Sequence, residues 1–121
     1  MKKVLVSILF LAAVLSLSHP AASQAGSNSL NDQLLIAAED GDTAAVQQSL
    51  DKGANIEATD KLGRTALIKA AIVGKTEVVK LLLAKGANIE ARDKDGTTAL
   101  GWAKVFAWDE TVKLLREHGA H

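Results

Sequence analysis

Apolar residues follow two different patterns along this chain. From Val4 to Leu17 they form an almost unbroken run, which only Ser7 and Ser16 interrupt. From about Leu30 onward they recur at the spacing of one helix face and alternate with polar and charged residues. This change of pattern separates a short apolar leader from a domain built of amphipathic helices.

The leader, residues 1–25, has the three-part plan of a secretory signal peptide. Lys2 and Lys3 precede the apolar run, and small residues at Ser23 and Ala25 stand where a signal peptidase reads. The run is shorter than the roughly 20 apolar residues that a membrane-spanning helix needs. We expect cleavage after Ala25, with Ser23 as the alternative site and an uncleaved signal anchor as the other interpretation. The short leader is of a bacterial type, which predicts a periplasmic or secreted protein.

The rest of the chain repeats itself with a period of 33 residues. The seven residues 52–58 recur without change as residues 85–91, and the glycine and alanine positions on either side keep the same offset. Such self-similarity is the signature of a stacked repeat protein. The domain is therefore expected to span residues 26–121, with repeats at about 31–63, 64–96 and 97–121.

Each repeat is predicted to contain two short helices. In the second repeat, Thr65 is placed to cap a helix that runs to about Val73, and Gly74 can supply the positive φ that ends it. Thr76 is then expected to cap a second helix, which Gly86 closes. Helices this short are unstable alone, so they must pack on their neighbours. The segment 93–96, Asp-Lys-Asp-Gly, reads as a turn between repeats.

These residues resemble the ankyrin repeat over about Leu30 to Ala120. The second repeat carries most of the family pattern: a turn at 60–63, Thr65, the paired alanines 70–71, Gly74, and the run 78–82 followed by Gly86 and Ala87. The resemblance implies an all-α solenoid of about three helix–turn–helix repeats joined by β-turn loops. It also implies a protein-binding module without catalytic activity.

Several positions depart from the family pattern. Alanine replaces the usual proline at 66 and 99, and Ile68 and Gly101 replace the usual histidine. In the third repeat, Ala107 and Trp108 stand where the second has Gly74 and Lys75, so we expect that turn to be looser or tilted. In the first repeat, Gln48 and Ser49 are expected to form the polar outer face of a capping repeat.

Small and branched residues are spaced to fill the gaps between the predicted helices. The tight gap is assigned to one alanine in each repeat, and the layer behind it to one valine in each repeat: Ala38, Ala71 and Ala103, and Val46, Val79 and Val112. A bulky or charged side chain at such an alanine is predicted to unfold the protein.

The sequence offers little reactive chemistry. It has no Cys, which excludes disulfides, a lipoprotein anchor and thiol catalysis. His118 and His121 lie at a terminus that is expected to fray, and Ser49 has no His nearby in the repeat register. The aspartates around Gly41 and Gly96 lack the Glu of a calcium loop. We therefore predict no catalytic residue, no metal site and no cofactor.

The charge balance also limits the classes of partner that the domain is expected to bind. Fourteen basic and fourteen acidic residues cancel, and loss of the leader leaves twelve against fourteen, a net charge of −2. Such a domain lacks the basic footprint of a nucleic-acid-binding protein. We expect no nucleic acid partner and no membrane contact after signal cleavage.

The ankyrin resemblance implies that a protein partner is held on a concave face, formed by the turn tips and the exposed edge of each first helix. Carried over to this chain, those positions are Glu39 and Asp40 in the first repeat and Lys61, Leu62, Arg64, Ile72, Val73, Lys94, Asp95, Thr97, Val105 and Phe106 in the others. The four apolar residues on the first helices favour a contact patch. The alternative is that they fold inward.

All three aromatic residues after the leader lie in the third repeat. Trp102 is predicted to be either an anchor on the concave face or part of the terminal core, and Trp108 is predicted to cover the last repeat. The function expected is recognition of a protein partner, whose identity is unknown. The alternatives are a structural, self-associating protein or an accessory factor to a periplasmic enzyme in stress defence.

Overall fold

The structure is a computed structural model that describes residues 29–121. The expected signal peptide, its cleavage site and the start of the domain at residue 26 lie outside the described residues. The described part contains helices α2 (Leu30–Asp40), α3 (Thr43–Asp51), α4 (Ala66–Val73), α5 (Thr76–Ala84), α6 (Ala99–Val105) and α7 (Asp109–Glu117), and none of its residues lies in a strand. The all-α class predicted from the sequence is confirmed.

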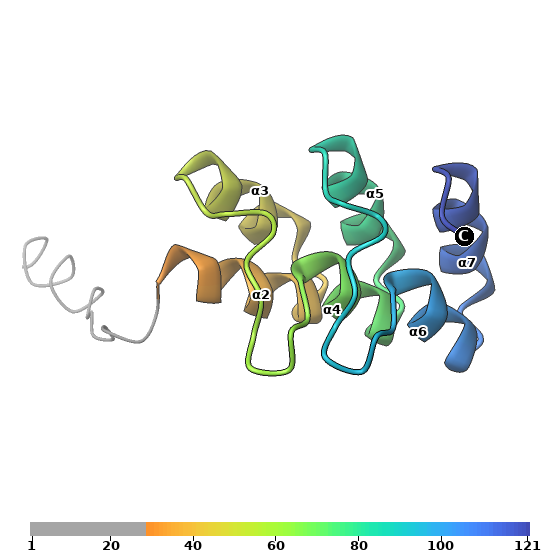
Figure 1. Cartoon of the computed structure of the whole chain (residues 1–121). Coiled ribbons are helices and arrows are strands. Elements are labelled where there is room, and N and C mark those ends of the chain that lie inside the picture. The colour runs from red at the N-terminus through yellow and green to blue at the C-terminus, as the bar shows by residue number, and fades with distance from the viewer. Residues whose placement is uncertain (1–28) are drawn as a thin grey trace, which may run out of the picture.

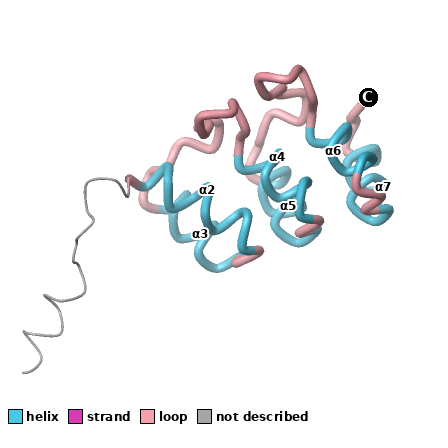
Figure 2. Tube along the Cα trace, turned by 90° about the horizontal axis from the view of Figure 1, so that it is seen from below, coloured by secondary structure: helices cyan, strands magenta, loops and turns pink. Residues whose placement is uncertain are grey.

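The helices form three antiparallel pairs that stand side by side (Figure 1). Helices α2, α4 and α6 make one layer and α3, α5 and α7 the other, and each helix packs on its counterpart in the next repeat. The two long connections project to the same side of the stack (Figure 2). This arrangement places the turn tips beside the layer of first helices.

The first helix of the second repeat begins and ends as predicted. The Thr65 hydroxyl accepts a hydrogen bond from the Ile68 N–H at 3.2 Å, and Gly74 ends α4 with a φ of 70°. The prediction for α5 was wrong, because its cap is Lys75 and Thr76 is already the first helical residue. The Thr76 hydroxyl points to the next repeat instead and lies 3.0 Å from the hydroxyl of Thr111.

The third repeat keeps the turn of the second, in contrast to the looser turn expected. Ala107 adopts a left-handed φ of 57° where Gly74 stands in the second repeat. The Trp108 N–H donates to the carbonyl of Ala103 at 2.9 Å, which matches the bond from Lys75 to the carbonyl of Ala70. Alanine therefore holds the glycine conformation, at a cost of about 1–2 kcal/mol for an L-residue.

One hydrophobic core runs through all three repeats. The predicted gap alanines at 38, 71 and 103 are fully buried, and so are Val46 and Val79 of the layer behind them, whereas Val112 is partly buried. The prediction for the first outer face was half right. Gln48 is exposed, but Ser49 is buried at the position where the next repeats carry the buried Leu82 and Leu115.

Candidate functional site

Two aspartates organise the turns that project from the stack. Asp60 accepts hydrogen bonds through one carboxylate oxygen from the backbone N–H groups of Leu62 and Arg64, both at 2.9 Å. Its other oxygen accepts a bond from the Lys69 ammonium at 2.9 Å. The carboxylate thus ties the turn to the exposed side of helix α4.

Asp93 does the same one repeat later. One of its oxygens accepts bonds from the N–H groups of Asp95 at 2.9 Å and Thr97 at 3.0 Å. The other accepts a bond from the indole N–H of Trp102 at 2.7 Å. Trp102 and Lys69 occupy equivalent positions at the 33-residue offset, so an indole replaces an ammonium as the link between turn and helix.

The two carboxylates stay ionised to lower pH than usual. Burial raises the pKa of Asp93, but the bonds from Thr97, Trp102 and Asp95 and the nearby charge of Arg64 outweigh it, and the pKa falls below its ordinary value. The pKa of Asp60 is lowered in the same way, because its backbone bonds and the Lys69 ammonium outweigh the effect of burial.

The turns also contact each other directly. The N–H of Lys94 donates to the carbonyl of Leu62 at 3.0 Å, and the N–H of Asn88 donates to the Glu57 carboxylate at 2.8 Å. Gly63 makes the first contact feasible, because a Cβ at this position would lie 3.0 Å from the Lys94 nitrogen. The tips are therefore held at a defined spacing.

Five of the predicted residues form one surface, which we call the inner-face patch: Arg64, Ile72, Val73, Trp102 and Phe106. The Trp102 and Phe106 rings stack with centroids 6.0 Å apart and an interplanar angle of 15°. The guanidinium carbon of Arg64 lies 5.3 Å from the Trp102 ring centroid, within the range of a cation–π contact. The patch therefore joins the second and third repeats.

A small cavity of about 50 Å³ opens beside Arg64. It is lined by Arg64, Ile72 and Val73 of the patch together with Glu39 and Lys69. The Lys69 ammonium lies 3.4 Å from the Glu39 carboxylate as well as 2.9 Å from that of Asp60, so its charge is balanced on both sides. The cavity is too small for anything beyond a single side-chain group.

The remaining predicted residues surround this patch or lie at the turn tips. The tips carry Lys61, Leu62, Lys94 and Asp95, which are exposed, and the half-buried Thr97. Val105 is 65% exposed at the end of α6, Phe106 is 47% exposed, and Glu39 and Asp40 are exposed at the end of α2. Ile72 and Val73 are half-buried, which lies between the exposed contact patch and the inward-folded arrangement that were expected. Trp102 packs on the core, which is one of its two predicted placements, and also stacks with Phe106.

Trp108 does not cover the last repeat as predicted. Its indole N–H donates to the carbonyl of Ile72 at 2.9 Å, and its ring lies over Gly74, where a Cβ would come within 2.5 Å of it. Trp108 therefore fastens the third repeat to the turn of the second. Glycine at position 74 supplies both the left-handed backbone and the room for this ring.

Sequence reasoning missed Lys69 and Asp93, although both shape the patch. A signal was present, because the 33-residue offset aligns Lys69 with Trp102 and Asp60 with Asp93. Considering these two aligned positions together would have linked each turn aspartate to a donor on the following helix.

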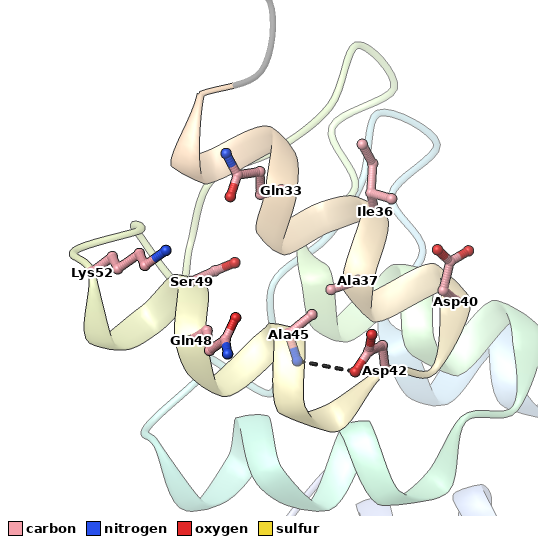
Figure 3. Close-up of a pocket in the computed structure, with 9 residues that line it drawn as sticks. All are labelled: Gln33, Ile36, Ala37, Asp40, Asp42, Ala45, Gln48, Ser49 and Lys52. Carbon is pink, nitrogen blue, oxygen red and sulfur yellow. Dashed lines mark hydrogen bonds between the residues drawn. The ribbon is translucent and has the colours of Figure 1, made fainter. Parts of the chain in front are cut away.

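A second hollow, of about 330 Å³, lies on the outward side of the first repeat between α2 and α3 (Figure 3). Its lining consists of Gln33, Ile36, Ala37, Asp40, Asp42, Ala45, Gln48, Ser49 and Lys52. Asp42 is occupied in capping α3, since its carboxylate accepts a bond from the Ala45 N–H at 3.0 Å. At the next repeat the positions of Gln33, Ala45 and Ser49 hold buried apolar residues, so this hollow is the polar counterpart of a packing surface.

Over residues 29–121, no group of three His, Asp or Glu side chains is arranged to hold a metal ion. Within the same range, none of the helices has the length and apolar character needed to cross a membrane. The patch and the tips carry an aromatic pair, the Arg64 guanidinium, and the exposed Lys61 and Lys94.

Comparison with known families agrees with this architecture. A family model described as "Ankyrin repeats (3 copies)" matches residues 34–121, which is most of the chain. The comparison with curated proteins finds no match. Ankyrin repeats imply a protein-binding module, and their domains are typically non-catalytic. Since the matched region contains all three helix pairs except the first turn of α2, the chain belongs to the ankyrin-repeat family.

Proposed function

We propose that this protein recognises a partner protein through the inner-face patch and the adjoining turn tips. The observation that carries the proposal is the Phe106–Trp102 pair, which leaves an aromatic surface exposed on a rigid scaffold. Aromatic side chains and arginine are the residue types that most often dominate binding energy at protein interfaces. Because hydrogen bonds already fix the tips and Trp102, binding would lose little conformational entropy.

The test replaces two exposed apolar groups, Leu62 at the first tip and Phe106 in the patch. The double alanine variant is expected to keep its circular dichroism spectrum and melting temperature, because both side chains are about half exposed. It should lose a partner that the parent protein captures from native extract and that a photo-crosslinker at Thr97 attaches. Ile36→Ala, which removes an equally exposed side chain from the first repeat, is the matched control. Equal capture by all three proteins would refute the proposal.

We further propose that the protein acts outside the cytoplasm of a bacterial cell. The proposal is supported by the lysine pair, the apolar run and the small residues before Ala25. A fusion of residues 1–28 to alkaline phosphatase without its own signal should be active in bacteria, because this enzyme needs export. Replacement of Leu9 and Leu11 by Arg should abolish the activity, and mass spectrometry of the exported protein should show Gly26 as the first residue. An inactive parent fusion would contradict the proposal.

A further inference from the structure

The Arg64 guanidinium is held in place, but it donates no hydrogen bond to the described residues around it. Its Nε lies 3.9 Å from the nearer Asp93 oxygen, which is too far for a hydrogen bond, and this buried atom has no other acceptor. Asp93 already accepts three bonds from other groups. Among the described residues, none accepts a hydrogen bond from the guanidinium. Arg64 therefore keeps its donors while its position is set by Asp93 and the Trp102 ring.

The aromatic part of the patch is also set in advance. The bond from Trp102 to Asp93 fixes the indole, and Phe106 stacks on it from the next turn of the chain. This pair presents an apolar ledge directly beside a cation, since Arg64 lies against the same indole. A ligand that satisfies both groups must carry an apolar side chain and an anionic group close together.

The charges near the patch favour an anion. The exposed Lys61 and Lys94 occupy the same position on successive tips, and Asp95 is the one exposed acid on the second tip. The neighbouring acids Asp60, Asp93 and Glu39 are already matched with donors of the protein. The four cations here, Arg64, Lys61, Lys94 and Lys69, are balanced by these acids and Asp95, so the preference for an anion comes from the Arg64 guanidinium, which donates no hydrogen bond to the described part of the protein. The two exposed lysines at the tips add a local attraction for an acidic segment.

We infer that the inner-face patch recognises a segment of a partner protein in which a carboxylate stands next to an apolar side chain. Arg64 takes the carboxylate through its unused N–H groups, and the ledge of Trp102 and Phe106 takes the apolar side chain. Lys61 and Lys94 add long-range attraction from the tips. This inference rests on the proposed function, since it names the chemistry of the partner at the same surface.

The experiment starts from random twelve-residue peptides displayed on phage and selected on the purified protein. The selected peptides are expected to share Asp or Glu beside Leu, Phe or Trp. Their affinities are then measured by fluorescence anisotropy for the parent protein, Arg64→Gln and Phe106→Ala. Lys113→Gln, an exposed site on α7 in the other layer, is the matched control. Circular dichroism melts verify that each variant is folded.

Arg64→Gln should weaken an acidic peptide about tenfold or more, because charge-assisted hydrogen bonds are lost. Changing the peptide's acid to its amide should weaken the parent complex by a similar factor, and the two changes together should add little. Lys113→Gln should have no effect.

Two kinds of failure are distinguishable. Neutral or basic peptides that depend on Phe106 but not on Arg64 would overturn this inference and leave the proposed function intact. Peptides that are indifferent to both substitutions, or a selection that enriches none, would overturn both.

Discussion

At the scale of single residues, the turn aspartates determine how the candidate site is built. Asp93 joins two backbone N–H groups and the Trp102 indole through one carboxylate. Asp95, two residues further on, is exposed and accepts none of the hydrogen bonds found among the described residues. Asp95 can therefore serve as the control for Asp93 when the stability contributed by these three hydrogen bonds is measured.

Asp93→Asn is expected to destabilise the fold by about 1–3 kcal/mol at neutral pH, because an amide cannot accept all three bonds and presents an N–H group to another donor. The loss should appear as a lower urea midpoint. Asp95→Asn is the control and should change the midpoint little. If both variants unfold at the same urea concentration, Asp93 does not hold the turn.

The lowered pKa of the same carboxylate predicts that the folded protein loses stability at low pH. The pKa of Asp93 is lower in the folded protein than its ordinary value of 3.8. Its contribution is therefore fully present above the pKa of the unfolded chain and is lost as pH falls through the folded pKa. The urea midpoint of the parent should drop below about pH 4. In Asp93→Asn this drop should be smaller, and an unchanged slope would show that other groups cause it.

At Ala107, in contrast, a substitution is predicted to increase stability. It holds a left-handed φ of 57°, a conformation that suits glycine better than alanine. Ala107→Gly should relieve about 1–2 kcal/mol of strain while the more flexible unfolded chain offsets about 0.4–1 kcal/mol. The expected net gain is a higher melting temperature. Ala84→Gly, at the exposed end of α5, should lower it instead, and a lower temperature for both would contradict the interpretation.

At the scale of helices, stability comes from close packing at small residues. Ala71 of α4 is fully buried, and Ala71→Glu would place a charge in a gap that has no room and no partner for it. This variant is expected to be unfolded by circular dichroism. Ala84→Glu, on the exposed end of α5, should melt cooperatively like the parent. A folded Ala71→Glu protein would show that this helix face is not buried.

The helices predicted best from sequence are those whose ends depend on local chemistry. Thr65 and Gly74 bound α4 as expected, because a hydroxyl cap and a left-handed glycine act within a few residues. The errors at Thr76, Ser49 and Trp108 have a different origin. Thr76 and Trp108 bond to groups 35 and 36 residues away, and Ser49 is buried by the helix arrangement. Such contacts follow from the stacking of repeats, which local patterns do not describe.

The candidate site was predictable to a similar extent. The family resemblance placed Arg64 and Phe106 on the expected binding surface and left Trp102 between that surface and the terminal core, and the structure brings the three side chains together. It did not indicate that Asp93 and Lys69 position this surface. Their roles depend on side chains that meet across a turn, where sequence spacing alone does not specify distance.

At the scale of the whole molecule, the two ends of the stack are polar. At the C-terminal end, exposed Lys104 and Arg116 occupy the positions that Ala71 and Leu83 hold in the second repeat. At the N-terminal end, Gln33 stands in the position of Ala66. The charges at the C-terminal end and the polar side chains at the N-terminal end oppose the stacking of one copy on another, because these groups would lose their hydration on contact.

The polar ends predict a monomer, whose sedimentation coefficient stays constant over a wide range of protein concentration. The double variant Lys104→Ala, Arg116→Leu restores residues of the interior type at the last repeat and should associate as concentration rises, because it exposes an apolar surface. Lys113→Gln, which removes a charge from the back of α7, is expected to remain monomeric. A parent protein that already dimerises, or a double variant that does not associate, would show that end-face polarity does not control assembly.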